Sequence, residues 1–199
     1  MTSVSKGETT RAAILDDALS LASRIGLEGL SIGELAKRTE MSKSGLFAHF
    51  SSKENLQVEV LRVAAQRFAE MVVAPAIRKP RGAPRVRALF ENWLRWSKAD
   101  FSPGGCIFIA ASTELDDRPG PTRDFLVGAQ RDFMATMAKS AQIAVEEGHF
   151  RSDLDTEQFA YEMYSIYLSY HHFARLLRSP HAERRARRAF AALLQRSAA

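Results

Sequence analysis

Residues 30–56 decide the fold of this chain, and they read LSIGELAKRTEMSKSGLFAHFSSKENL. Ser31 followed three residues later by Glu34 forms a capping box, which satisfies free amide groups at the start of a helix. A short helix is therefore expected over about residues 32–38.

A second short helix is expected after a turn of about four residues. Ser42 is placed to cap it, and Leu46 and Phe50 fall on its inner face. A longer helix then opens with a second Ser-x-x-Glu pair, Ser51 and Glu54. Two helices of about seven residues joined by such a turn have the dimensions of a helix-turn-helix.

Apolar residues recur at helical spacing along almost the whole chain, and no segment alternates convincingly with the period of a strand. The pattern predicts an all-α fold of about nine helices, with Gly26 as the C-terminal cap of the first. Prolines at 75, 80 and 84 predict a break in a basic linker after the fourth helix. The later helices are expected at about residues 85–101, 106–116, 121–147, 156–178 and 181–196.

Composition favours a protein of the cytoplasm. The 199 residues are 46% hydrophobic and 26% charged, as in ordinary globular chains. Apolar runs such as residues 106–111 fall well short of the roughly 18 residues that a membrane helix needs. The N-terminus lacks the apolar core of a secretion signal. The single cysteine, Cys106, lies among apolar residues and is expected to be a buried thiol.

Net charge is weak evidence for a nucleic-acid partner, because the positive excess lies at one end. The total is +5, but residues 1–67 hold nine Lys/Arg and eight Asp/Glu, a net of +1. Residues 68–174 hold twelve Lys/Arg and fourteen Asp/Glu, a net of −2. Residues 175–199 hold seven Arg and one Glu, a net of +6, and we interpret their arginine cluster as a solvated face.

The outer face of the helix that ends at Phe50 has the chemistry of a surface that enters a DNA groove. Small residues there let the backbone approach base edges, lysine donates to guanine or phosphate, and histidine donates to phosphate. Helix N-termini near Ser42 and Lys53 add amide donors for phosphates. Each residue alone also fits an ordinary surface position, so the prediction depends on the whole set. The outer side chains are those of Lys43, Ser44, Gly45, Phe47, Ala48 and His49.

The same residues carry a resemblance to a known family. The segments 10–19, 32–36, 41–50 and 52–56 resemble the N-terminal domain of the TetR (tetracycline-repressor) family. The resemblance implies a repressor-like homodimer whose third helix lies in the major groove of operator DNA. It assigns phosphate contacts to Thr10, Ser42, Phe47, His49 and Lys53, and base contacts to Lys43, Ser44, Gly45 and Ala48.

The sequence departs from the family pattern at three places. Phe47 stands where the family usually has tyrosine, so only van der Waals contact with the phosphate backbone is expected there. Ser44 and Gly45 replace a common Gly-Thr pair, so the operator sequence of a relative does not transfer. Glu40 stands where the turn usually has glycine, and a side chain at positive φ costs backbone energy.

The rest of the chain is expected to sense a ligand, as the resemblance implies. We expect residues 1–55 to form the DNA-binding domain and residues 56–199 a helical ligand-sensing and dimerisation domain. An aromatic-walled cavity would suit a mostly apolar small-molecule effector. Ordinary core packing of the same side chains stays open as the alternative. The candidate lining residues are Phe68, Met71, Trp93, Trp96, Phe108, Phe133, Met137, Tyr167 and His171.

The helix at about 156–178 carries more apolar surface than one neighbouring helix covers, which favours a second subunit as its partner. Together with the last helix it would form the intersubunit four-helix bundle that the resemblance implies. The candidate interface residues are Phe159, Met163, Ile166, Tyr170, Phe173, Phe190, Leu193 and Leu194.

The sequence therefore predicts a DNA-binding transcriptional regulator, a ligand-responsive repressor that acts as a homodimer on a pseudopalindromic operator. Its expected partners are operator DNA, a second copy and the effector, with no membrane, metal ion or cofactor. An enzyme is disfavoured because Cys106, the five histidines and the Asp116-Asp117 pair form no recognisable catalytic or zinc-binding pattern. A helical protein-interaction module that no longer reads DNA is the alternative, and activation in place of repression stays open.

Overall fold

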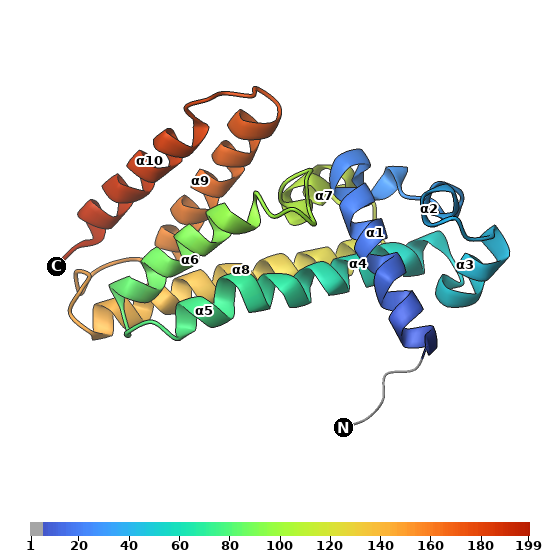
Figure 1. Cartoon of the computed structure of the whole chain (residues 1–199). Helices are drawn as coiled ribbons and strands as arrows, with labels where there is room; N and C mark the ends of the chain where they lie inside the picture. Colours follow the sequence, from blue (N-terminus) through green and yellow to red (C-terminus); the bar gives the residue numbers. More distant parts are fainter. Residues whose placement is uncertain (1–5) are drawn as a thin grey trace. The chain divides into compact units, whose positions relative to one another are not determined.

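The computed structural model describes residues 6–199, and regular structure in this part of the chain is helical (Figure 1). One isolated extended bridge joins Phe150 to Ala198. The elements are α1 (Lys6–Gly29), α2 (Ile32–Thr39), α3 (Lys43–Phe50), α4 (Lys53–Phe68), the π-helix η1 (Ala69–Val73), α5 (Ala74–Ile77), α6 (Ala83–Trp96), α7 (Ile107–Leu115), α8 (Pro121–Glu146), α9 (Thr156–Arg175) and α10 (Ala182–Ser197). The all-α prediction is confirmed.

The helices α4, η1 and α5 follow one another without a gap, so the described residues form nine separate helical runs, as predicted. The position of the break after the fourth run differs from the prediction. Pro75 lies inside the run, because the wider π-helical turn before it accommodates a residue that lacks an amide donor. The chain leaves the helix after Ile77 and re-enters one after Gly82, whose φ is 85°.

The described chain divides into two compact units. The first combines the residues up to Arg67 with residues 98–127, and the second combines residues 68–97 with residues 128–199. Each unit therefore consists of two separate stretches of the sequence. Among the described helices, none has the length and hydropathy that crossing a bilayer requires.

The first unit packs α1, α2 and α3 around a core of leucines and Phe50, and α7 lies against α1. The predicted end of the first helix is confirmed at Gly26, whose φ of 80° and ψ of 166° interrupt α1. Gln57 lies in this core and donates from Nε2 to the Leu27 carbonyl at 2.7 Å. Gly104 approaches α1 so closely that a Cβ would collide with the Ser23 carbonyl, which explains a glycine there.

The second unit has a core rich in aromatic rings. Trp93 on α6 stacks on Tyr167 of α9 with ring centroids 4.1 Å apart, and Phe90 stacks on Phe190 of α10 at 3.9 Å. Asn92 is buried and donates to the Val72 carbonyl at 3.0 Å, which ties α6 to the π-helical turn. Helices α9 and α10 pack along each other as an antiparallel pair, visible in Figure 1.

Candidate nucleic-acid interface

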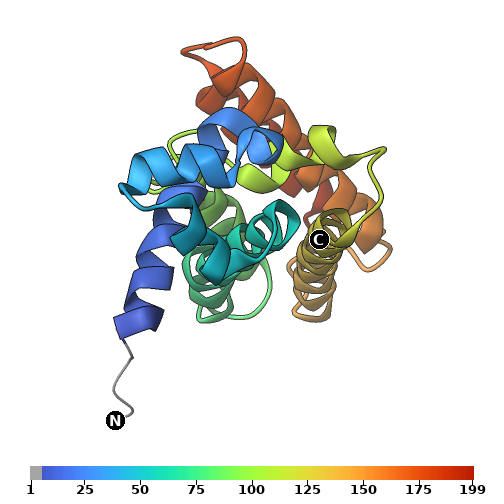
Figure 2. The ribbon, with the colours of Figure 1, turned by 90° about the vertical axis from the view of Figure 1, so that its right-hand side faces the viewer.

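Serines cap both short helices, as their places in the sequence predict. The Ser31 hydroxyl accepts a hydrogen bond from the Glu34 amide at 3.1 Å, and the Ser42 hydroxyl accepts one from the Gly45 amide at 3.1 Å. Each bond satisfies an amide that the helix itself leaves without a partner. Figures 1 and 2 show the resulting pair of short helices, α2 and α3, joined by a tight turn beside α1.

Glu40 makes the turn between α2 and α3. Its φ of 55° and ψ of 25° lie in the left-handed region, where a residue with a side chain pays about 1–2 kcal/mol. The Glu40 and Met41 amides both donate to the Ala36 carbonyl, so this turn closes α2 without glycine. The expected backbone cost at this position is therefore present.

The two faces of α3 divide as the sequence predicts. Leu46 and Phe50 are both 0% exposed, in the core of the first unit. The opposite face presents side chains that are small, cationic or aromatic. Ser42, Lys43, Ser44, Phe47 and Ala48 are exposed, and Gly45 and His49 are half-buried.

Phe47 exposes 51% of its surface, although it is a large apolar side chain. Lys43 makes no ion pair within the described residues that would hold its ammonium against the protein. His49 lies beside the Phe50 ring, with centroids 6.1 Å apart. The outer face of α3 thus offers one cation, Lys43, and one exposed ring, Phe47. Its other side chains are small enough for the helix to approach a base edge.

Lys53 and Thr10 differ from the rest of the predicted phosphate contacts. The Lys53 ammonium donates to the Glu28 carbonyl at 2.7 Å and lies 3.5 Å from the Glu28 carboxylate, so it is already engaged inside the protein. A phosphate at Lys53 would compete with these bonds. Thr10 is half-buried near the start of α1, away from α3 in the sequence.

Glu28 joins three segments of the first unit, and this junction was missed by the sequence analysis. Its carboxylate also lies 2.9 Å from the Arg118 guanidinium, and its backbone amide donates to the Glu114 carboxylate at 2.8 Å. Burial acts to raise the pKa of the Glu28 carboxyl, but Lys53 and Arg118 together bring that pKa below its ordinary value. No local pattern marks partners that are 25 to 90 residues apart in sequence.

Other basic residues of the first unit are also used in ion pairs between helices. Arg38 of α2 binds the Asp17 carboxylate of α1 at 2.9 Å, and Arg11 of α1 binds Glu59 of α4 at 2.7 Å. These pairs hold α1, α2 and α4 in register.

The structure brings most of the predicted pocket residues together in the second unit. The Phe68 ring lies 5.2 Å from Trp96 and 4.7 Å from Phe133, and Tyr167 packs on Trp93. We call these five rings the aromatic compartment. Their exposed fractions are 8% for Phe68, 1% for Trp93, 0% for Trp96, 8% for Phe133 and 0% for Tyr167.

Four further residues that were predicted to line the pocket are not among these five rings. Met137 is buried in the same unit, and His171 is half-buried one turn after Tyr167 on α9. Met71 is wrong as a lining residue, because it is 38% exposed; in the π-helical turn, Val72 is the buried side chain. Phe108 is buried on α7, which belongs to the first unit.

Most of the predicted interface residues are covered within one chain. Six of them, Phe159, Met163, Tyr170, Phe190, Leu193 and Leu194, are at most 7% exposed. The argument that a second subunit must cover them is therefore wrong, because α9 and α10 of the same chain pack on each other and on the unit's core. Ile166 and Phe173 keep accessible surface.

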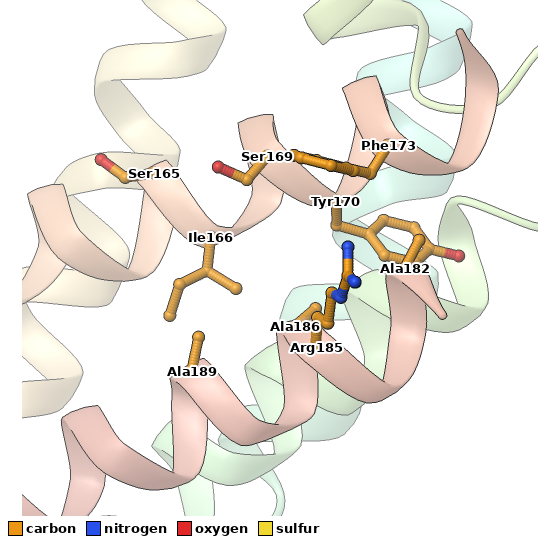
Figure 3. A pocket seen from close by; sticks show the side chains of 9 residues that line it. All are labelled: Ser165, Ile166, Ser169, Tyr170, Phe173, Ala182, Arg185, Ala186 and Ala189. Atoms are coloured by element: carbon orange, nitrogen blue, oxygen red, sulfur yellow. The ribbon is translucent and has the colours of Figure 1, made fainter. Parts of the chain in front are cut away.

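A groove of about 250 Å³ runs between α9 and α10 on the surface of the second unit. Figure 3 shows Ile166 of α9 and Ala189 of α10 pointing toward one another across it, with Arg185 near Tyr170. Small residues of α10 form one wall, which gives the groove a largely apolar floor.

The chain matches two family models that together cover most of its length. Residues 14–60 match the family described as "Bacterial regulatory proteins, tetR family". Residues 82–190, more than half of the chain, match "Tetracyclin repressor-like, C-terminal domain".

Relatives agree with these matches. The repressor AcnR of Corynebacterium glutamicum is 36% identical over 67 residues, which are 34% of this chain and 36% of AcnR. The match therefore spans about a third of that relative's length.

Solved structures share the fold over almost the whole chain. A TetR-family regulator from Cytophaga hutchinsonii has a TM-score of 0.85 at 16% identity, covering 99% of this chain and 98% of the other. AibR, solved in complex with isovaleryl coenzyme A and operator DNA, has a TM-score of 0.75 at 22% identity, covering 92% and 97%. With a capped helix-turn-helix, an all-helical second unit and family matches to both, this chain belongs to the TetR family of bacterial transcriptional regulators.

Proposed function

We propose that this chain is a ligand-responsive repressor that binds a pseudopalindromic operator as a homodimer in the cytoplasm, where that DNA lies. In this proposal residues 1–55 form the DNA-binding domain, and residues 56–199 sense an effector and hold the dimer together. Repression is supported by the relative AcnR, which is named a repressor.

The observation that carries the proposal is the outer face of α3. A helix capped by Ser42 and anchored by Leu46 and Phe50 presents Lys43, Ser44 and Ala48 to the outside. Short side chains let the helix backbone lie close to base edges, and lysine donates to guanine or phosphate. Phe47 would pack on the sugar-phosphate backbone. This arrangement suits a recognition helix in the major groove.

The α9–α10 groove supports a homodimer. Among the described residues, five of the nine large exposed apolar side chains lie between residues 161 and 177, namely Tyr161, Leu168, Phe173, Leu176 and Leu177. Three of them lie on α9 and two directly after it, and Phe173 also lines the groove, so this part of the chain exposes apolar surface that a partner could cover. Two copies that place α9 and α10 against α9 and α10 would form a symmetric four-helix bundle.

The aromatic compartment supports a mostly apolar effector. AibR was solved with a small-molecule ligand and operator DNA together, so this fold accommodates both kinds of partner in that protein. An effector that binds two dimer conformations unequally would shift their populations and change the separation of the two recognition helices. Half-sites about 34 Å apart would then no longer be reached together.

The test is selection from a genomic fragment library at moderate salt. The parent chain is compared with the double variant K43A/S44A and with the control K37A, which removes another exposed lysine, on α2. We expect the parent and K37A to enrich one palindromic site and K43A/S44A to lose it, because Lys43 and Ser44 lie on the face that reads bases.

Failure of the parent to enrich any fragment across a range of salt concentrations would contradict the proposal. That result would favour the protein-interaction module, whose helix-turn-helix would be a packing unit only. Equal enrichment by K43A/S44A would contradict the assignment of α3 as the reading helix.

A further inference from the structure

Helix α9 carries two buried polar atoms that have no hydrogen-bond partner within the described residues. They are the Tyr167 hydroxyl oxygen and His171 Nδ1. The two residues are four positions apart on α9, so their side chains lie one turn apart on the same face of the helix.

Aromatic rings surround Tyr167, whereas its hydroxyl needs a hydrogen-bond partner. Its ring centroid lies 4.1 Å from Trp93, 5.8 Å from Phe90 and 6.0 Å from Phe133, with interplanar angles of 14° to 20°. Tyr164, one turn earlier, donates its hydroxyl to Gln130 at 3.1 Å and is therefore already used. The Tyr167 hydroxyl remains isolated in an apolar compartment.

A buried water is a poor explanation for this isolation. A water molecule is held inside a protein by two to four polar partners, whereas the side chains packed around the Tyr167 ring are mostly aromatic. Buried hydroxyl groups in folded proteins almost always have a partner, because leaving one without costs its full desolvation energy. A group that comes from a bound molecule accounts for both atoms.

The charge state of the pair restricts what that molecule is. Burial raises the pKa of the Tyr167 phenol well above its usual range, helped by the Glu91 carboxylate. Burial lowers the pKa of the His171 imidazole, helped by Arg175 and His172. Both groups are therefore neutral near pH 7, so they match a neutral oxygen and offer no counter-charge to an ion.

We propose that Tyr167 and His171 are the polar contacts of the effector, and that the effector is an uncharged ring compound bearing a carbonyl or hydroxyl oxygen. Its ring packs against Trp93, Trp96 and Phe133, and its oxygen accepts the Tyr167 O–H or bonds to His171 Nδ1. This inference rests on the proposed function, because it names the class of molecule that the regulator senses. Phe68 and Phe133, the least buried of the five rings, mark the side by which the ligand enters.

Three probes of similar shape test the inference: acetophenone, ethylbenzene, which lacks the oxygen, and benzoate, which is charged. Dissociation constants are measured by equilibrium dialysis on the full chain. The position of binding is read from tryptophan emission, because the chain has two tryptophans and both lie in the aromatic compartment. We expect the parent to bind acetophenone about tenfold more tightly than ethylbenzene, and benzoate not at all.

Tyr167→Phe removes the hydroxyl and keeps the ring. We expect it to reduce the preference for acetophenone to within about threefold and to leave ethylbenzene binding unchanged. His171→Leu should weaken acetophenone binding in the same direction. The control is Tyr170→Phe, which removes a hydroxyl from the next turn of α9, at the α9–α10 groove, and should keep the parent's preference.

The ligand-free proteins give a second measurement. Because Tyr167→Phe removes a donor that has no partner, its melting temperature should equal or exceed that of the parent. A lower melting temperature would mean that the hydroxyl is satisfied in the folded chain, and would overturn the inference. Equal binding of acetophenone and ethylbenzene by the parent, or no binding of any probe, would also overturn it.

Operator selection on the same preparations separates this inference from the proposed function. Selective DNA binding without any preference for the oxygen-bearing probe would contradict only the effector class. A clear oxygen preference in a chain that enriches no DNA would contradict only the proposed regulation.

Discussion

Phe47 is the residue where this chain departs most informatively from its family. Tyrosine at the corresponding place would donate a hydrogen bond to a phosphate, whereas phenylalanine offers only its ring. The structure leaves 51% of that ring exposed on the outer face of α3. Contact with DNA would remove this apolar surface from water, so the ring still favours binding.

Phe47→Tyr should therefore increase operator affinity about fivefold, because a phosphate hydrogen bond is worth about 1 kcal/mol. Phe47→Ala should decrease it by a similar factor. Fluorescence anisotropy on the selected operator measures both, and the urea midpoint should stay constant because the side chain is exposed. If both variants bind like the parent, Phe47 does not touch DNA.

A second prediction at the scale of the residue concerns the Glu28 carboxyl group. Its pKa is lowered in the folded chain, so the folded form binds the proton less tightly than the unfolded form. The stability from its pairs with Lys53 and Arg118 is therefore present above the ordinary carboxyl pKa and lost as pH falls through the lower folded pKa.

Glu28→Gln should consequently flatten the acid limb of the stability curve. Urea unfolding from about pH 5 to about pH 3 should show the parent losing more stability than the variant. Asp117→Asn, which removes an exposed carboxylate of the first unit, is the control and should follow the parent. A parallel decline of Glu28→Gln and parent would refute the role of the junction.

At the scale of the element, the N-terminus of α3 is closed by the Ser42 cap, and in the proposed complex the same end faces DNA. The Ser42 hydroxyl accepts the Gly45 amide and lies 3.1 Å from the Ser44 hydroxyl. The cap at Ser42 therefore stabilises the helix, whereas the charge at this position affects how well a phosphate binds. Substitutions that change one and keep the other separate the two effects.

Ser42→Ala should destabilise the fold by about 1 kcal/mol, because the cap is lost. Ser42→Asp and Ser42→Asn both keep a capping oxygen and should keep the parent's stability. Only Ser42→Asp should lose operator affinity, by about tenfold or more, because its charge repels a phosphate. Chemical denaturation and anisotropy are the two measurements. Equal affinity of Asp and Asn variants would place Ser42 away from DNA.

Helices α9 and α10 carry the prediction about assembly. Ile166→Glu and Ala189→Glu place a carboxylate in the groove between them, and a buried unpaired charge is costly. Sedimentation velocity should show dimers of the parent and monomers of both variants. Ile77→Glu makes the same change of an exposed residue on α5, away from the groove, and should remain dimeric. Dimeric groove variants would exclude this face as the interface.

For the whole molecule, the net charge does not indicate which surface would bind DNA. The positive excess lies in the last 25 residues. Within them, Arg187 forms ion pairs with both Glu91 and Glu183. Arg196 forms an ion pair with Glu162. Part of the arginine cluster thus stabilises the second unit. Arg184 and Arg188 remain as exposed charges on α10.

The double variant R184A/R188A should keep operator affinity within about twofold of the parent at moderate salt, because these arginines do not belong to the helix-turn-helix and salt screens exposed charges. K43A/S44A, which removes only one positive charge, should abolish selection. A large loss in R184A/R188A, with a smaller slope against salt concentration, would reveal a second DNA-contacting surface.

The sequence alone determined α2 and α3, their caps and the helix-turn-helix. The predicted cap of the fourth helix was wrong by one residue, because Ser52, and not Ser51, accepts the Asn55 amide at 3.0 Å. Ser31, Ser42 and Gly26 act on amides and carbonyls a few residues away, so local order in the chain specifies these features completely. The inward placement of Leu46 and Phe50 follows from the same helical period. Even the strained turn at Glu40 was visible as a missing glycine.

Only the tertiary structure decided which side chains meet across the chain. The Glu28 junction, the intrachain covering of Phe159 and Leu194, and the isolation of the Tyr167 hydroxyl all depend on helices that are distant in sequence. The helical period shows which residues lie on the apolar face of a helix, but it does not show which other helix covers that face. That choice depends on packing among all helices at once, and packing is a property of the folded chain.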